Sequence, residues 1–140
     1  MATVGATPRG TKRVLIVDDD AALVHVLRDA LGLFRHDHAY AVETARDGVE
    51  GLEALERGQF DLVLLDMCMP RMTGLDLLAQ MRLRGLQTPV LMLTGNEDNR
   101  FAADALARGI FAYVPKPFDL QHLEVLISLA ASPRSATTPA

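Results

Sequence analysis

The sequence has few of the features that mark secreted, membrane-spanning or nucleic-acid-binding proteins. It contains one cysteine in 140 residues, which excludes an intramolecular disulfide framework and fits a reducing compartment. No stretch approaches the roughly 18 uninterrupted apolar residues of a membrane span, and residues 1–12 lack the apolar core of a signal peptide. The net charge of -4 argues against direct nucleic-acid binding, because neutralising phosphates requires a basic face. These absences predict a soluble cytoplasmic protein.

What the sequence does contain is a regular alternation of short apolar runs and helical patterns. With 49% hydrophobic and 23% charged residues in 140, it has the composition and length of one globular domain. Strands are expected at residues 14–17, 40–44, 62–65, 90–93 and 112–114. Helices are expected at residues 21–33, 48–57, 75–83, 99–107 and 120–131. This alternation predicts an α/β fold in which helices cover both faces of a parallel sheet.

The two ends of the chain depart from this pattern. Residues 2–11 and 132–140 are rich in Thr, Ala, Ser, Gly and Pro, a composition typical of flexible ends. We therefore expect a flexible N-terminus at residues 1–12, a folded domain at residues 13–131, and a flexible tail or truncated linker at residues 132–140.

Polar side chains follow four of the apolar runs. Asp18 and Asp19 come directly after the first run, and Asp66 comes after the third. Thr94 follows the fourth run, and Lys116 lies just beyond the fifth. Because ligands of parallel α/β sheets bind beyond the carboxyl ends of the strands, we expect these side chains to meet in one crevice.

Such a group of side chains suits a metal ion and a phosphoryl group. Two carboxylates about 4 Å apart repel by roughly 4 kcal/mol at an effective dielectric constant near 20, so a proton or a cation must neutralise them. Oxygen ligands favour a hard cation such as Mg²⁺, which commonly binds one or two carboxylates, waters and a phosphate-type ligand. A carboxylate beside the metal can act as a nucleophile, and an ammonium and a hydroxyl can bind phosphoryl oxygens. Asp66 is the best candidate nucleophile.

Four segments carry a close resemblance to a known family. They read VLIVDDD, LVLLDMCMPRMTGLDLL, VLMLTGN and AYVPKPF, in that order and at ordinary spacings. These segments resemble the receiver domain of bacterial response regulators, and the similarity covers roughly residues 13–131. The resemblance implies a flavodoxin-like, doubly wound sheet of five parallel strands in the order 2-1-3-4-5, with five helices.

The resemblance also assigns roles to the acidic residues. It makes Asp66 the phosphoacceptor, and it makes Asp18 and Asp19 the acid pair that positions Mg²⁺. Asp66 and the backbone carbonyl of Cys68 are the further metal ligands that it implies. The third acid of the first cluster, Asp20, is expected to be the N-cap of the first helix instead.

Three residues near the ends of the fourth and fifth strands match other family positions. Thr94 and Lys116 match the hydroxyl and the ammonium that bind the phosphoryl group, and Tyr113 matches the aromatic switch residue. A strand tyrosine is more commonly core filling, with its hydroxyl at the edge. The family also implies a cis peptide bond between Lys116 and Pro117.

The function implied is that of a signalling phosphoacceptor that catalyses its own phosphorylation and dephosphorylation, not of an enzyme acting on another substrate. A sensor histidine kinase or a phosphotransfer protein would be the donor. Readout to a downstream target or a homodimer would use the fourth helix, the fifth strand and the fifth helix. From its charge and hydropathy, we expect this chain to bind neither a membrane nor nucleic acid directly.

Three side chains leave alternatives open. The thiol of Cys68 either tunes hydrolysis beside the phosphoryl group or is irrelevant next to its own carbonyl. Ile110 and Phe111 precede the fifth strand, where they either fill the core or form an apolar partner surface. Because side chains alternate along a strand, at most one of these two neighbours is expected to point into the core. We expect both residues to contribute to a partner surface gated by Tyr113.

Three rival functions fit the same residues less well. A haloacid-dehalogenase-type phosphohydrolase also uses an aspartate nucleophile and Mg²⁺, but its DxDx(T/V) motif would need a hydroxyl or branched residue where Ala22 stands. A dinucleotide-binding domain needs a glycine-rich first turn, whereas no glycine occurs between Arg13 and Leu31. A pseudo-receiver that only binds partners is disfavoured by the complete set of site residues.

Overall fold

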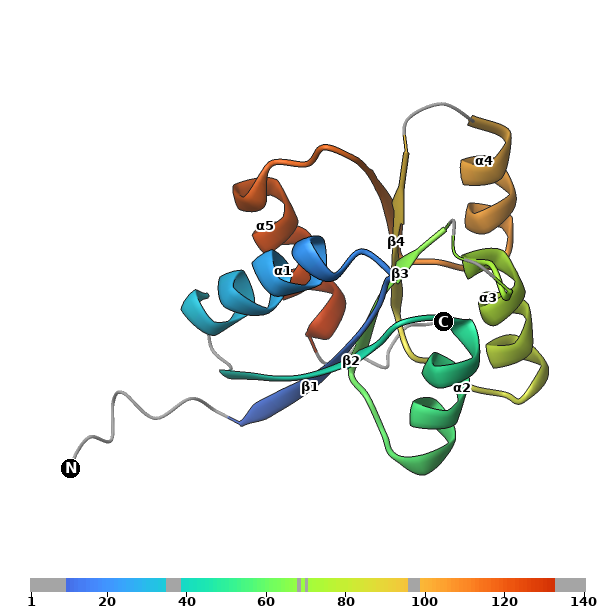
Figure 1. The fold of residues 1–140 in the computed structure, drawn as a ribbon, viewed down its shortest axis with the longest axis horizontal. Coiled ribbons are helices and arrows are strands. Elements are labelled where there is room, and N and C mark those ends of the chain that lie inside the picture. Colours follow the sequence, from blue (N-terminus) through green and yellow to red (C-terminus); the bar gives the residue numbers. More distant parts are fainter. Residues whose placement is uncertain (1–9, 35–38, 68, 70, 96–98, 133–140) are drawn as a thin grey trace, which may run out of the picture.

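A five-stranded parallel sheet forms the centre of the molecule (Figure 1). The computed structural model describes residues 10–34, 39–67, 69, 71–95 and 99–132. The strands lie in the order β2-β1-β3-β4-β5, which confirms the predicted flavodoxin-like topology. Their bounds are β1 (Thr11–Val17), β2 (Ala39–Ala45), β3 (Leu62–Asp66), β4 (Val90–Thr94) and β5 (Ala112–Pro115).

The first strand begins earlier than the sequence pattern predicts. Thr11 and Lys12, which we expected in the flexible N-terminus, pair with Ala39 and Tyr40 of β2. The apolar run begins only at Val14, where the strand becomes fully buried. Backbone pairing with β2 needs no apolar side chains, so hydropathy alone cannot locate this end of the strand.

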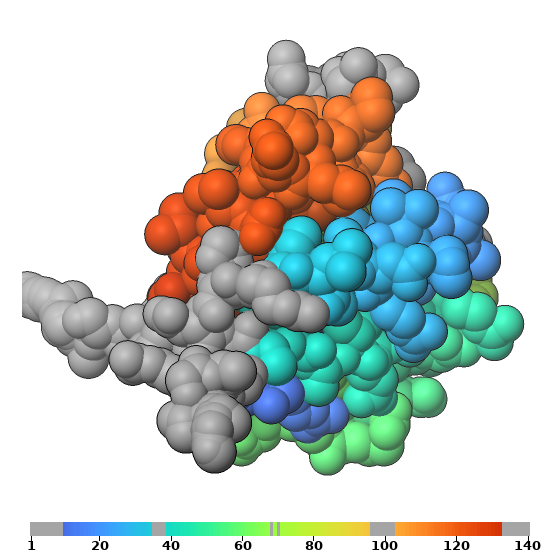
Figure 2. All heavy atoms as spheres, turned by 90° about the vertical axis from the view of Figure 1, so that its left-hand side faces the viewer, coloured from blue at the N-terminus to red at the C-terminus, as the bar shows by residue number. Residues whose placement is uncertain are grey.

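Five helices cover the two faces of the sheet, which confirms the doubly wound arrangement (Figure 1). Helices α1 and α5 lie next to each other on one face (Figure 2), and α2, α3 and α4 lie on the other face (Figure 1). The bounds are α1 (Ala21–Leu33), α2 (Gly48–Arg57), α3 (Gly74–Leu83), α4 (Asn99–Ala107) and α5 (Leu120–Ala131). None of the described helices is long and apolar enough to span a membrane.

The core consists of two apolar layers, one on each face of the sheet. Every residue of β3 and β4 is buried, as expected for central strands of a parallel sheet. Helix α1 buries Leu27, Ala30 and Leu31 against the sheet. Val26 is 46% exposed, because at about 100° per residue it falls at the edge of this buried stripe.

Polar side chains at the helix starts position the loops that follow the strands. Asp20 caps α1 by accepting hydrogen bonds from the backbone N–H groups of Ala22 and Leu23, which confirms its predicted role as an N-cap. Thr73 and Asp76 form a reciprocal capping box at the start of α3. These caps end the connections after β1 and β3 at defined residues.

Gly74 closes the connection between β3 and α3 by packing against the end of β3. A Cβ atom at this position would lie 2.4 Å from the carbonyl oxygen of Asp66 and 2.8 Å from the Cα of Met67. Its backbone N–H also donates a 2.8 Å hydrogen bond to the carbonyl of Met67. A larger residue at position 74 would therefore displace the backbone that carries Asp66.

Gly74→Ala should lower the free energy of unfolding by about 1–3 kcal/mol, the usual cost of overpacking. The clash is with backbone atoms, which cannot move aside as a flexible side chain can. Urea denaturation measures the change. Gly32→Ala in α1 is the matched control, because its Cβ would meet nothing within 4 Å and alanine favours a helix. Equal stability of Gly74→Ala and wild type would contradict the tight contact.

Candidate functional site

The predicted acidic residues meet at the carboxyl end of the sheet. Asp66 is the last residue of β3, while Asp18 and Asp19 directly follow β1. Val17 lies opposite Leu65 in the parallel register, so the two strand ends deliver their carboxylates side by side. Ligand oxygens of all three acids lie within 4.8 Å of one another. Asp18 and Asp66 are only 1% and 4% exposed, respectively.

Lys116 bridges the two buried acids from the end of β5. Its Nζ lies 3.1 Å from Oδ1 of Asp66 and 3.5 Å from Oδ2 of Asp18. The other carboxylate oxygen of Asp18 accepts a 2.8 Å hydrogen bond from the backbone N–H of Asp20. The backbone N–H of Lys116 donates to the carbonyl of Thr94, and the Lys116–Pro117 peptide bond is cis, as the family resemblance implied.

Thr94 lies at the end of the strand next to β3. It is buried, and its hydroxyl donates a 2.6 Å hydrogen bond to the carbonyl of Gly95. Thr94 also lies opposite Pro115, the residue before Lys116, in the register of β4 and β5. Thr94 and Lys116 therefore stand at the ends of neighbouring strands.

Burial and mutual repulsion make the acid pair electrostatically unfavourable. Burial, together with the nearby charge of Asp66, raises the pKa of Asp18, although the Asp20 N–H and Lys116 partly oppose this effect. Burial by itself would lower the pKa of Lys116, but the attraction of Asp18 and Asp66 outweighs it and raises that pKa. The ammonium is thus firmly charged, while three carboxylates face one lysine.

The three carboxylates fit a hard divalent cation. They offer oxygen ligands, two from buried residues and one from an exposed residue, and their excess negative charge over Lys116 favours a cation. Cys68, whose carbonyl is the further ligand implied by the resemblance, lies outside the described residues. The metal assignment therefore rests on Asp18, Asp19 and Asp66.

The residues before and within β5 divide between core and surface. Ile110 is 7% exposed and belongs to the same apolar cluster as Met92 and Ala105, so our expectation that it joins a partner surface is wrong. Phe111 is 41% exposed, and Tyr113 is also exposed. The backbone N–H of Phe111 donates to the carbonyl of Val90. Ile110 and Phe111 both precede β5, and Ile110 packs into the apolar cluster on the opposite face of the sheet from Ala112 and Val114, so the alternation of β5 does not account for its burial.

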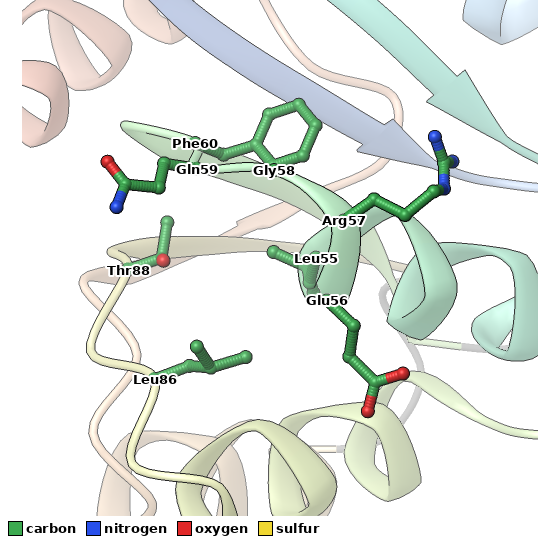
Figure 3. Close-up of a pocket in the computed structure, with 8 residues that line it drawn as sticks. All are labelled: Leu55, Glu56, Arg57, Gly58, Gln59, Phe60, Leu86 and Thr88. Carbon is green, nitrogen blue, oxygen red and sulfur yellow. The ribbon is translucent and has the colours of Figure 1, made fainter.

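A separate hollow lies away from these groups, beside the amino ends of β3 and β4 (Figure 3). It has a volume of about 480 Å³, and the side chains of Leu55 and Leu86 point into it (Figure 3). None of the predicted site residues lines it. Its lining residues are Leu55, Glu56, Arg57, Gly58, Gln59, Phe60, Leu86 and Thr88. The hollow is therefore separate from the convergent acids and lysine.

Comparison with known families matches this arrangement. The family model described as "Response regulator receiver domain" matches residues 14–128. The chain belongs to this family of two-component signalling proteins. The matched segment of the receiver domain contains all the site residues discussed above.

Individual relatives and solved structures agree with the family match. The receiver domain is 40% identical over 111 residues to the response regulator MprA of Mycobacterium sp. (strain KMS). The aligned segment covers 79% of this chain and 46% of the relative. The chain thus spans about half the length of the curated relatives it matches. A CheY-like receiver domain of Methanospirillum hungatei JF-1 is 33% identical, covering 86% of this chain and 94% of that one, with a TM-score of 0.77. A receiver domain from Clostridium thermocellum is 29% identical, covering 86% and 94%, with a TM-score of 0.78.

Two residues beside the site were missed by sequence reasoning. Asp47 is buried and forms an ion pair with Arg71, which lies between β3 and α3. An aspartate just before a helical pattern is a recognisable N-cap signal, so Asp47 could have been found. Arg71 has a φ of 69°, a left-handed backbone conformation that is uncommon for residues other than glycine. Nothing in the sequence around Arg71 predicts it.

Asp18→Asn should raise the free energy of unfolding at pH 7 in EDTA, by on the order of 1 kcal/mol, because it removes a buried charge beside Asp66. The amide oxygen can still accept the hydrogen bond from Asp20. The folded-state pKa of Asp18 lies above its unfolded value, so the wild type loses stability as the pH rises between the two values. The advantage of the variant should therefore vanish below about pH 4, where Asp18 is protonated in both states. Urea unfolding at several pH values tests this, and a gain independent of pH would contradict the charge effect.

Proposed function

We propose that this receiver domain accepts a phosphoryl group on Asp66 from a sensor histidine kinase or a phosphotransfer protein, in a Mg²⁺-dependent reaction. The observation that carries the proposal is the contact between Lys116 and Asp66, 3.1 Å from Nζ to Oδ1, beside the buried carboxylate of Asp18. This contact places the carboxylate of Asp66 next to a cation that can also bind phosphoryl oxygens.

In the proposed reaction, an oxygen of Asp66 attacks the phosphorus of a phosphohistidine in line. The new P–O bond forms as the P–N bond breaks, and the imidazole leaves with the bonding electrons and takes up a proton. Lys116 offsets charge on the transferring oxygens, as positioned cations do in phosphoryl transfer generally. The hydroxyl of Thr94, which now donates to Gly95, would turn to donate to a phosphoryl oxygen.

Asp18, Asp19 and Asp66, together with the carbonyl of Cys68, would hold the Mg²⁺ ion. When bound, this ion would offset the charge of the carboxylates and of the phosphoryl oxygens. Asp18 and Asp66 are held in place by the ends of buried strands and by Lys116. Asp19 is exposed, so it can adjust to the ion at little cost in packing.

The response to phosphorylation would be a shift between two populations of the domain. Only contacts that differ between the states can cause such a shift, and the turn of the Thr94 hydroxyl is one of them. Tyr113, exposed on β5, would move inward in the same transition. The surface of α4, β5 and α5, including Phe111, would then bind a downstream target or a second copy of the chain.

Asp66→Asn should abolish labelling by acetyl phosphate or by the cognate kinase, because the near-isosteric amide cannot attack phosphorus. Mass spectrometry of the intact protein measures the added phosphoryl group. Asp29→Asn, on the exposed surface of α1, should label like the wild type and serves as the matched control. An acid-labile phosphate on Asp66→Asn would remove Asp66 from the mechanism, and an unlabelled wild type would favour a pseudo-receiver.

Asp19→Asn should weaken Mg²⁺ binding by roughly tenfold or more, because a carboxylate ligand is lost while the fold is kept. Calorimetric titration of the unphosphorylated protein measures the affinity. Asp20→Asn is the control, since asparagine is also a good N-cap and Asp20 already caps α1. Unchanged Mg²⁺ affinity in Asp19→Asn would refute this ligand assignment.

A further inference from the structure

The connection from Asp66 to Gly74 is fixed at both of its ends. At the first end, the backbone N–H of Met67 donates a 2.9 Å hydrogen bond to the carbonyl of Leu93. At the second end, Gly74 donates to the carbonyl of Met67 and packs against the carbonyl of Asp66. Gly74, three residues after Arg71, is therefore in direct contact with the backbone of Asp66 and Met67.

The middle of the connection is held by Arg71. Among the residues that the structure describes, Arg71 is the one non-glycine residue with a positive φ, 69°. A side chain in this region is held against its own preference, so the surroundings must fix it. A guanidinium nitrogen of Arg71 bonds to Oδ2 of Asp47.

Asp47 holds both the arginine and the start of α2. Its Oδ1 accepts a 2.9 Å hydrogen bond from the backbone N–H of Glu50, while its Oδ2 accepts from Arg71. The Glu50 N–H and the Arg71 guanidinium together hold the pKa of Asp47 below its ordinary value, against the opposing effect of burial. This carboxylate is thus charged at neutral pH and occupied on both oxygens.

The start of α2 is also tied to the strand that carries Asp18. The carbonyl of Ala45, two residues before Asp47, accepts a 3.1 Å hydrogen bond from the backbone N–H of Asp18. A Cβ atom on Gly51 would lie 3.1 Å from the side chain of Val17, the residue before Asp18. A continuous set of contacts therefore runs from Asp18 through Asp47 to the connection that follows Asp66.

A second contact joins α2 to the same connection. A Cβ atom on Gly48 would lie 2.7 Å from side-chain atoms of Met72. Met72 is the residue directly after Arg71, so the ion pair and this apolar contact hold two consecutive residues against α2. Together they leave little room for the connection to move relative to Asp18.

We propose that Asp47 and Arg71 form a clamp that holds the connection between β3 and α3, so that Asp18 and Asp66 keep the spacing needed for Mg²⁺ binding and phosphoryl transfer. The inference rests on the proposed function of Asp66. Asp47 and Arg71 contact neither the acceptor nor the lysine in the hydrogen bonds described above, so they act as positioning residues.

Four variants separate the parts of the clamp. Asp47→Asn removes the charge but keeps an oxygen for the Glu50 N–H, so the cap of α2 survives. Arg71→Gln removes the charge and keeps most of the side chain. Arg71→Gly removes the pair and also permits the positive φ at no steric cost, and Arg71→Lys keeps the charge. The double variant Asp47→Asn/Arg71→Gln tests whether the two residues act as one unit.

The control is a second ion pair at the other end of the sheet. Nε of Arg84 lies 2.8 Å from Oε2 of Glu56, a residue that lines the hollow of Figure 3. Arg84→Gln breaks this pair, which does not involve the connection after Asp66. It should leave Mg²⁺ affinity and phosphorylation unchanged.

Mg²⁺ affinity, the rate of phosphorylation by acetyl phosphate and the midpoint of thermal unfolding are measured for each variant. We expect Asp47→Asn and Arg71→Gln each to weaken Mg²⁺ binding by roughly three- to tenfold, and the double variant to be no weaker than either one. Arg71→Lys should recover part of the loss. Arg71→Gly should lose affinity with little change in stability, which distinguishes positioning from a general loss of fold.

A readout without metal completes the test. In EDTA, exchange of the Gly74 amide hydrogen should be faster in Asp47→Asn and Arg71→Gln than in the wild type, because the connection can then open at its closing hydrogen bond. Wild-type Mg²⁺ affinity and wild-type exchange in these variants would overturn the clamp, as would additive losses in the double variant. An unlabelled wild type would refute the proposed function of Asp66, and metal affinity and Gly74 exchange would still decide the clamp.

Discussion

The contact of Lys116 with two buried carboxylates is the interaction on which the rest of the site depends. An isolated charge is costly to bury, and removing one member of a buried pair leaves the other uncompensated. Lys116 reaches both Asp18 and Asp66, which makes their burial tolerable, but its single positive charge offsets only one of the three carboxylates of Asp18, Asp19 and Asp66. The site thus keeps an excess of negative charge that a divalent cation would relieve.

The fold makes this arrangement possible by ending buried strands in charged residues. The apolar residues of β1 and β3 bury the backbone up to the acids, so the carboxylates cannot move apart by fraying of the strand ends. The sheet order places β1 and β3 side by side, and the chain supplies Lys116 from the far edge strand β5. The burial of β1 and β3 in the core therefore holds carboxylates close together although they repel one another.

The sequence was sufficient to predict the sheet, its helices and the meeting of the acids, because each depends on a repeated local pattern. It was not sufficient for Ile110, since two adjacent apolar residues before a strand do not reveal which of them packs into the core, as Ile110 does. Arg71 was missed for a different reason. Its side chain bonds to Asp47, a residue 24 positions earlier in the chain, and no local pattern records such a contact.

The proposed phosphorylation adds negative charge to the site, and this change would drive the proposed shift between the two populations of the domain. An aspartyl phosphate replaces one carboxylate charge with close to two, so the site gains about one negative charge. Lys116 is already engaged by both acids, and a further donor is needed to offset the gain. The hydroxyl of Thr94 donates to a backbone carbonyl one residue away, a bond that can be exchanged for a charge-assisted one. The pull on Thr94 at the end of β4, next to the strand that carries Tyr113, is therefore the first step by which the proposed reaction would reach the surface.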